Sequence, residues 1–158
     1  MPPPEKQRRC VFLDRDGVIN ENAAPHDYIR SWNQFRFLPN IAGWIRIFNA
    51  LDFLVIVITN QRGIARGLMT RESVDEIHSN MIAELAEQGA RIDDVFMCPH
   101  EEASCNCRKP KPGMLIEAQA KWNIDLAGSL FIGDSDSDEA LALGCGVRFL
   151  RVRDGRIV

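Results

Sequence analysis

A buried strand that ends in two carboxylates is the feature that most constrains this chain. The apolar segment from Cys10 to Leu13 runs directly into Asp14, Asp16 and Gly17. Open α/β folds hold their ligands at the carboxyl ends of strands, and extended geometry would turn Asp14 and Asp16 to the same side. Two such carboxylates repel each other unless a cation or a proton lies between them. An ordinary strand followed by a polar turn would also explain this pattern, because aspartate and glycine are common in turns.

Three later segments carry further groups that a single chemistry would need. In chain order they are Thr59-Asn60-Gln61 after the apolar run 53–58, Arg108-Lys109 before Pro110, and Asp134 and Asp138 after the apolar run 130–132. A hydroxyl, amides and cations can all bind phosphate oxygens. Any one of these residues has an ordinary structural explanation. Four segments carrying an acid pair, a hydroxyl, a lysine and another acid favour a phosphate-processing site.

The four segments together resemble the motifs of the haloacid dehalogenase-like (HAD) phosphohydrolase superfamily. The resemblance runs from about Cys10 to Val152. It rests on Asp14-Arg-Asp16-Gly-Val, Thr59-Asn60, Lys109 and Gly133-Asp134-x-x-x-Asp138. The stretches 14–20, 59–67, 98–100 and 105–110 narrow it to one subfamily. That subfamily contains D-glycero-D-manno-heptose 1,7-bisphosphate 7-phosphatase and the histidinol-phosphate phosphatases. The stretch 61–67 is more similar to the heptose branch.

This resemblance implies a mechanism through an aspartyl phosphate on Asp14. Asp16 would protonate the leaving alkoxide and then deprotonate water. Thr59 and Lys109 would stabilise the transferring phosphoryl group, and Asp138 would orient Lys109 or a metal-bound water. A catalytic Mg²⁺ would be held by the Asp14 carboxylate, the Asp16 backbone carbonyl and the Asp134 carboxylate, all oxygen ligands.

Apolar runs and helical patterns alternate along the chain. We expect strands at 11–13, 53–58, 94–97, 129–132 and 147–152. Helices are expected after Asn40, from Thr70 to about Gln88, after Pro112-Gly113 to about Trp122, and over 138–143. Such alternation indicates an α/β fold with a parallel sheet between two helical layers. The resemblance implies a three-layer Rossmann-like HAD fold with strand one central and no separate cap domain. We expect one domain over residues 10–158 and a flexible tail over residues 1–9.

Three of the five cysteines lie within ten residues. Cys98, His100, Cys105 and Cys107 form a C-x-H-x4-C-x-C cluster, which supplies the four ligands of a tetrahedral structural zinc. A disulfide such as Cys98–Cys105 is the alternative, but thiols stay reduced in a cytoplasmic protein. We therefore predict a zinc-binding loop that directs Arg108 and Lys109 inward. Cys10 and Cys145 are predicted to be core residues.

Substrate contacts are expected from Asn60, Gln61, Arg62 and Arg108, which flank the catalytic motifs. His26 and His78 are interpreted as surface or partly satisfied histidines, and Asp136 as an exposed residue at a helix start. The resemblance to the heptose branch implies a phosphorylated sugar as substrate, namely D-glycero-D-manno-heptose 1,7-bisphosphate with release of its 7-phosphate.

Charge and apolar patterning argue against nucleic acid and membrane as binding partners. The net charge of −3 argues against nucleic acid, and the apolar runs are shorter than the roughly 20 residues that span a bilayer. The N-terminus also lacks a signal-peptide pattern. We therefore expect a cytoplasmic monomer that contacts neither nucleic acid nor membrane. The alternatives are a histidinol-phosphate phosphatase, a polynucleotide 3′-phosphatase and, outside enzymes, a zinc-stabilised binding module.

Overall fold

A six-stranded sheet forms the centre of the molecule. The computed structural model describes residues 1–102 and 105–158, so part of the predicted zinc-binding loop, residues 103–104, lies outside the described residues. The strand order is β3-β2-β1-β4-β5-β6. The strands are β1 (Cys10–Leu13), β2 (Leu54–Asn60), β3 (Asp94–Cys98), β4 (Leu130–Gly133), β5 (Arg148–Arg153) and β6 (Arg156–Ile157). The first five are parallel, and β6 is antiparallel to β5.

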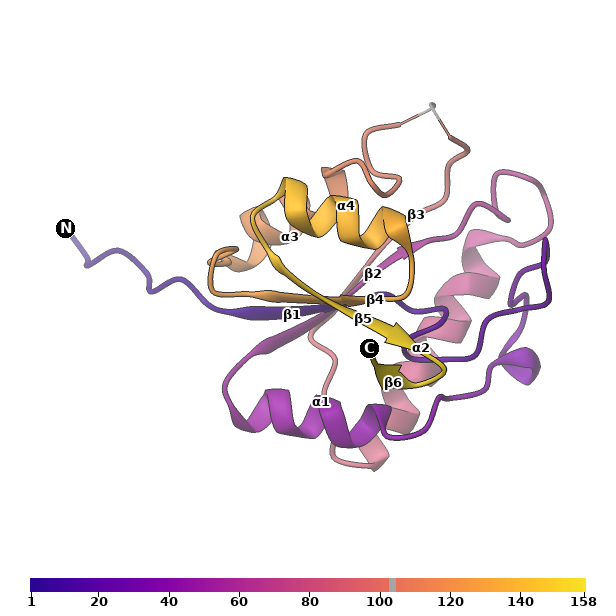
Figure 1. Ribbon diagram of the computed structural model, residues 1–158, viewed down its shortest axis with the longest axis horizontal. Helices are drawn as coiled ribbons and strands as arrows, with labels where there is room; N and C mark the ends of the chain where they lie inside the picture. The colour runs from indigo at the N-terminus through magenta and orange to yellow at the C-terminus, as the bar shows by residue number, and fades with distance from the viewer. Residues whose placement is uncertain (103–104) are drawn as a thin grey trace.

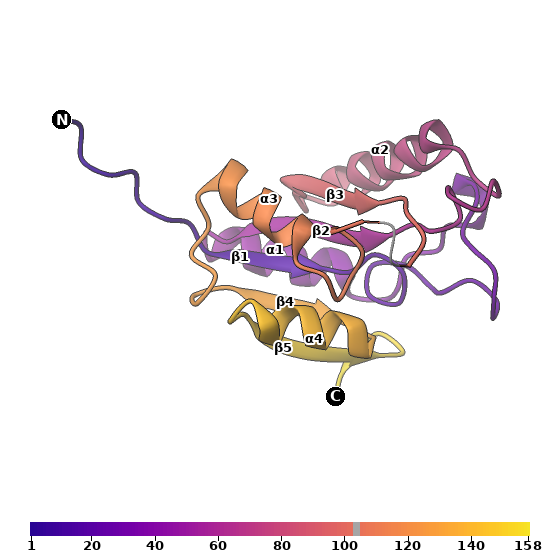
Figure 2. The same ribbon diagram turned by 90° about the horizontal axis from the view of Figure 1, so that it is seen from above.

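Two pairs of helices cover the two faces of this sheet (Figures 1 and 2). The helices are α1 (Ile41–Ala50), α2 (Arg71–Glu87), α3 (Gly113–Trp122) and α4 (Asp136–Gly144), and a short 3-10 helix, η1, covers Trp32–Gln34. Residues of α1 and α2 pack in one core cluster with Val11, Leu13 and Val55. Residues of α3 and α4 pack in a second cluster with Phe12, Ile56 and Phe131. Alternate residues of a strand thus enter opposite cores.

The central strands form because they are apolar on both faces. All four residues of β1 and the first six of β2 are buried, as expected for parallel strands between two helical layers. Thr70 starts α2 with a capping box: its hydroxyl accepts from the Ser73 N–H, and the Ser73 side chain accepts from the Thr70 N–H. Because β1, β2 and β4 are parallel neighbours, their carboxyl ends lie at one edge of the sheet.

The predicted three-layer α/β fold is confirmed. β1 lies between β2 and β4, in the central position expected. No segment of the described chain forms a separate cap domain. Two details differ from expectation. Thr59 and Asn60 are the last residues of β2 rather than residues that follow it. The two-residue strand β6 was not predicted, because its pairing with β5 depends on a tight turn at Asp154 and Gly155, both at positive φ.

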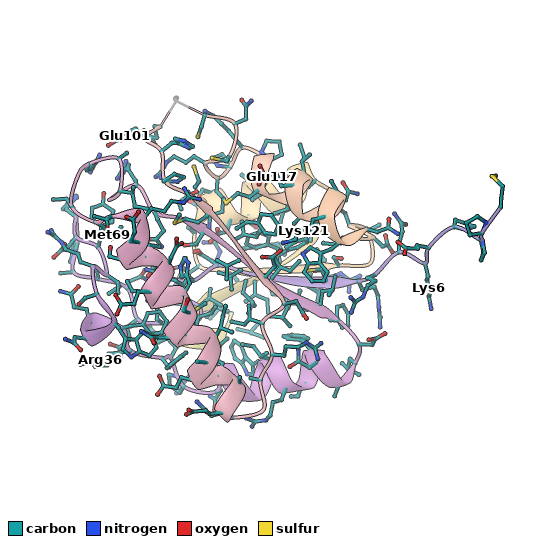
Figure 3. The ribbon with its side chains drawn as sticks, turned by 180° about the vertical axis from the view of Figure 1, so that it is seen from behind. Lys6, Arg36, Met69, Glu101, Glu117 and Lys121 are labelled. Atoms are coloured by element: carbon teal, nitrogen blue, oxygen red, sulfur yellow. The ribbon has the colours of Figure 1, made fainter. Side chains whose placement is uncertain are left out.

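Residues 1–9 are exposed. The chain extends away from the sheet at this end, and Lys6 lies on the extended segment that leads to the N-terminus (Figure 3). The Glu5 carbonyl accepts from Asn123 Nδ2 at 3.2 Å, and Arg8 makes a bridge to Ile124, so contact with the domain begins before β1. The flexibility of the tail stays a prediction. Among the described residues, each helix is too short or too polar to cross a bilayer.

Candidate active site

Three carboxylates meet at the carboxyl edge of the sheet. Asp14 follows β1, Asp134 follows β4, and Asp138 lies in the first turn of α4. One oxygen from each lies within 4.8 Å of the others. Ser135 starts α4 with a capping box that binds the Asp138 N–H and side chain, which fixes Asp138 toward the sheet. The pairing of β1 with β4 therefore brings Asp14 to Asp134 and Asp138, which are already close in the chain.

Lys109 joins this cluster from the loop that precedes α3. Its Nζ donates to Asp14 Oδ1 at 2.9 Å, to Asp138 Oδ1 at 2.7 Å and to the Ile58 carbonyl at 3.1 Å. Burial alone would lower the pKa of Lys109, but the carboxylates of Asp14 and Asp138 outweigh burial and raise it. Lys109 is therefore positively charged, and each of its three ammonium protons is donated to one of these acceptors.

The cluster retains an excess of negative charge despite Lys109. Burial raises the pKa of Asp14 well above its ordinary value, and the opposing effect of Lys109 is offset by Asp138 and Asp134. Burial also raises the pKa of Asp134. Three hard oxygen donors facing a single ammonium group fit a Mg²⁺ ion, which would relieve their mutual repulsion. Asp14 and Asp134 are the carboxylates not fully engaged by Lys109.

Gly17 allows the loop after β1 to pass directly over Asp134. Its φ is +89°, a conformation that residues with a side chain rarely adopt. A Cβ at this position would overlap the Asp134 carboxylate and approach the Asn22 amide. Asn22 Nδ2 in turn donates to Asp134 Oδ2 at 3.2 Å. The glycine is thus required by close contact as well as by backbone conformation.

The Asp16 carboxylate has separate surroundings from the acid cluster. Arg15 donates to its Oδ1 through Nη2 at 2.8 Å and Nε at 3.2 Å, and Asn20 Nδ2 adds a third donor at 2.9 Å. Gln61 Nε2 donates to Oδ2 at 3.1 Å. Burial would raise the pKa of Asp16, but Arg15 and the two amides lower it overall. The expected repulsion between Asp14 and Asp16 is therefore relieved at Asp16 by a neighbouring arginine.

The end of β2 supports the cluster from the side. Gln61 Nε2 also donates to Thr59 Oγ1 at 2.9 Å, so one amide links Thr59 with Asp16. Asn60 Oδ1 accepts from the Lys109 N–H at 3.0 Å, and Asn60 Nδ2 donates to the Lys109 carbonyl at 3.4 Å. The Asn60 side chain thus holds the backbone that carries Lys109. Its predicted contact with substrate, like that of Gln61, stays a prediction.

Cys98, His100, Cys105 and Cys107 converge at the end of β3. Their candidate ligand atoms lie within 4.8 Å of one another. Burial would raise the pKa of Cys105, but the N–H groups of Arg108 and Cys107 outweigh burial and lower it to about 6, whereas burial raises the pKa of Cys98 and of Cys107. This donor set of three sulfurs and one nitrogen fits tetrahedral zinc, which requires thiolates. Cys105 Sγ accepts from the Arg108 N–H at 3.4 Å, so the cluster is tied to the residue before Lys109.

Comparison with known proteins agrees with this geometry. The HAD-hydrolase-like family model matches residues 106–157. A D-glycero-beta-D-manno-heptose-1,7-bisphosphate 7-phosphatase from Rhodopseudomonas palustris is 42% identical over 149 residues, covering 89% of this chain and 81% of that protein. The chain belongs to the HAD-like hydrolases. The relatives of this HAD-like hydrolase also include a D-glycero-alpha-D-manno-heptose-1,7-bisphosphate 7-phosphatase from Campylobacter jejuni, 39% identical over 88% of this chain and 78% of that protein.

A solved structure shares the fold of this HAD-like hydrolase. The D,D-heptose 1,7-bisphosphate phosphatase from B. bronchiseptica, complexed with magnesium and phosphate, superposes with a TM-score of 0.86. It is 36% identical, and the match covers 94% of this chain and 83% of that one. The magnesium in that relative accords with the oxygen donors that Asp14 and Asp134 present here.

The rim of the site in this HAD-like hydrolase carries several arginines. Arg62 Nε and Arg66 Nη1 both donate to Tyr28 Oη, at 3.4 and 3.2 Å, and Arg66 pairs with Glu101 at 2.7 Å. Glu101 lies on the loop after β3 (Figure 3). The Nη1 atom of Arg108 is buried and has no hydrogen-bond partner among the described residues. Of the four predicted substrate-binding residues, Arg108 therefore has the clearest capacity to bind a further anion.

The sequence analysis did not identify two residues near the site of this HAD-like hydrolase, Arg15 and His78. Arg15 is fully buried between Asp16 and His78, and His78 on α2 is 6% exposed rather than at the surface. The sequence did offer one indication for Arg15, because this residue stands between Asp14 and Asp16. A cation at that position must either face solvent or pair with one of the two carboxylates. Asp136 is exposed as predicted, Cys10 is buried, and Cys145 is half-buried.

Proposed function

We propose that this chain is a Mg²⁺-dependent phosphomonoesterase that releases the 7-phosphate of D-glycero-D-manno-heptose 1,7-bisphosphate. The observation that carries the proposal is the Lys109 ammonium bridging Asp14 and Asp138, at 2.9 and 2.7 Å, beside the carboxylate of Asp134. Relatives whose names specify this reaction support the choice of substrate.

Asp14 is the proposed nucleophile. Its Oδ1 accepts from Lys109 Nζ and from the Arg15 N–H, at 2.9 and 2.8 Å. These two donors fix the carboxylate and leave Oδ2 to attack phosphorus. A bond from Oδ2 to phosphorus forms while the bond from phosphorus to the sugar oxygen breaks, which yields an aspartyl phosphate.

Asp16 moves the proton in both steps. Its Oδ1 accepts three donors, so the proton is carried on Oδ2, beside Gln61. Asp16 is ionised in the free protein, and the phosphate dianion brings a negative charge that favours its protonation. Oδ2 then protonates the leaving sugar oxygen. In the second step it removes a proton from the water that attacks phosphorus, and inorganic phosphate leaves Asp14.

Lys109 and Thr59 are placed to stabilise charge on the phosphoryl oxygens, because phosphoryl transfer depends mainly on positioned cations and donors. Asp138 keeps the Lys109 side chain directed at Asp14. Asp14, Asp134 and the backbone carbonyl of Asp16 would hold Mg²⁺. When bound, this ion neutralises charge on the phosphate and orients it in line with the nucleophile.

Arg108 accounts for the preference for a bisphosphate. Lys109 and the metal suffice for the phosphate that is transferred. The Nη1 atom of Arg108, which has no hydrogen-bond partner among the described residues, remains for a second anion. Arginine binds phosphate through two parallel N–H donors. Arg62, held near the same rim by Tyr28, adds positive potential.

A phosphate-release panel tests this proposal. It compares both anomers of heptose 1,7-bisphosphate with histidinol phosphate, a 3′-phosphorylated oligonucleotide and p-nitrophenyl phosphate. We expect the highest kcat/KM on one heptose anomer. Arg108→Ala should lower kcat/KM for that substrate at least about 10-fold more than for p-nitrophenyl phosphate, because one charged contact is worth about 1.5–3 kcal/mol.

Arg91→Ala is the matched control. Arg91 pairs with Asp93 at the opposite edge of the sheet, so its loss should affect all substrates equally and slightly. Equal losses for Arg108→Ala on both substrates would place Arg108 on the transferring phosphoryl group instead. A preference of the wild type for histidinol phosphate would overturn the heptose assignment.

A further inference from the structure

We propose that Arg15 and His78 form a buried support that orients Asp16 for proton transfer, so that a histidine on α2 is a positioning residue for the reaction. The inference rests on the proposed function, because it assigns a role within that site. Three contacts carry it: two from the Arg15 guanidinium to Asp16 and one from the same group to His78.

Arg15 has no exposed surface and is the bulkiest fully buried side chain among the described residues. A guanidinium removed from water is costly unless its N–H groups are paired. Its Nε and Nη2 both donate to Asp16 Oδ1, and its Cζ lies over the Phe35 ring, 5.9 Å from the ring centroid. The arginine can therefore leave this position only by breaking its pairing with Asp16.

His78 satisfies the remaining side of the guanidinium. Arg15 Nη1 lies 3.1 Å from His78 Nε2, and both side chains are buried. Because Nη1 can only donate, Nε2 must be the acceptor and the ring must be neutral. In agreement, burial and the charge of Arg15 lower the pKa of His78 to about 3. His78 is thus an acceptor on α2 that lies 63 residues from Arg15 in the chain.

The consequence for Asp16 is geometric. Arg15 and Asn20 together engage Oδ1 with three donors, so rotation of the carboxylate is blocked and Oδ2 faces the site. Without an acceptor at His78, Nη1 would be buried and unpaired. The guanidinium would then turn toward another acceptor, and Asp16 would lose its orientation. General acid catalysis depends on such placement and contributes about 10²–10⁴-fold to rate.

Leaving-group dependence distinguishes positioning from a purely structural role. The sugar oxygen of an alkyl phosphate must be protonated as it leaves, whereas p-nitrophenolate leaves without a proton. We compare His78→Leu, which removes the acceptor, with His78→Gln, whose amide oxygen can replace it. His78→Leu should lower kcat/KM for the heptose bisphosphate about 10²-fold and for p-nitrophenyl phosphate less than about 3-fold. His78→Gln should recover most of the loss.

A second signature comes from the hydrolysis of the aspartyl phosphate, in which Asp16 acts as the base. With p-nitrophenyl phosphate, His78→Leu should release a burst of about one p-nitrophenol per chain, because the second step alone is slowed. If His78→Leu folds poorly, both tests are repeated with Arg15→Lys. Lysine keeps the positive charge but cannot pair with Asp16 and His78 at the same time.

Met81→Ala is the control for loss of stability. Met81 is fully buried one turn further along α2 and, among the described residues, forms no hydrogen bond with Asp16 or Arg15. Equal losses on both substrates in His78→Leu and Arg15→Lys, as in Met81→Ala, would overturn the positioning role and leave the proposed function intact. A wild type that hydrolyses none of the panel would refute the proposed function, and this inference with it.

Discussion

The ammonium nitrogen of Lys109 lies 2.7 Å from Oδ1 of Asp138, although 29 residues separate them in the chain. This contact joins the loop before α3 to the first turn of α4. Because Lys109 also binds Asp14, the same ammonium group fixes the distance between the proposed nucleophile and Asp138. The catalytic geometry therefore depends on a buried charge network as well as on the sheet.

Replacing the proposed nucleophile should separate activity from stability. Asp14→Asn keeps the shape of the side chain but removes the attacking oxygen anion, so turnover should fall by at least about 10⁴-fold. Burial opposes the charge of Asp14, so the variant should unfold at the wild-type temperature or slightly above it. Phosphate release and thermal unfolding measure the two effects. Near wild-type turnover, with deamidation excluded by mass spectrometry, would refute the assignment.

Asp138→Asn tests the support of Lys109. The side chain of Asp138 is fully buried, and loss of its charge leaves Lys109 with one carboxylate instead of two. Breaking a buried pair costs about 3–5 kcal/mol, and we expect about 3 kcal/mol here because Asp14 remains. Turnover should fall as well.

Asp136→Asn in the same helix is the control for Asp138→Asn. The side chain of Asp136 is 98% exposed and pairs with Arg151 at the surface. Its loss should change the free energy of unfolding by less than about 1 kcal/mol. Similar unfolding curves for the two variants would show that the pair between Lys109 and Asp138 does not stabilise the fold.

The Cys/His cluster should hold zinc. Purified protein should contain about one zinc per chain by elemental analysis. Cys107→Ser should lose the metal, unfold at a lower temperature and turn over slowly, because the Arg108–Lys109 backbone is tied to the cluster. Cys145→Ser, at a half-buried cysteine elsewhere, should keep zinc and activity. Full activity in zinc-free protein prepared without chelator would refute a structural role.

His78 should make stability depend on pH. Its pKa is lowered from 6.5 to about 3 in the fold, chiefly by burial. The unfolded chain therefore binds one more proton between these values, so the stabilisation is complete above about pH 6.5 and is lost as the pH falls. Each pH unit should cost up to about 1.4 kcal/mol.

His78→Gln should remove this dependence, since glutamine does not titrate. Denaturant unfolding between about pH 7 and pH 5 measures the slope for each protein. Met81→Ala should lower stability by a similar amount at both pH values, because it changes packing alone. The same slope in wild type and His78→Gln would show that the buried ring binds its proton as readily as an exposed one.

The sequence predicted the fold and the meeting of the four motif segments, because both depend on local pattern and on the parallel topology. Apolar runs located β1 and β2, and the capping residues located α2. The environment of Asp16 could not be predicted in this way. It depends on His78, which lies 63 residues from Arg15, and no periodicity indicates that these two side chains meet. Likewise, the hydrogen bond between the Asn60 amide and the Lys109 backbone could not be predicted, because tertiary packing sets this contact.

The central claim is that this chain transfers the 7-phosphoryl group of a sugar bisphosphate to Asp14 and then to water. ³¹P NMR of heptose 1,7-bisphosphate during turnover tests it most directly, because the two phosphates give separate signals. We predict that the C7 signal is replaced by inorganic phosphate while the C1 signal persists, and that Asp14→Asn produces neither change. Loss of the C1 signal first, or an unchanged spectrum under conditions in which the wild type hydrolyses histidinol phosphate, would contradict the account.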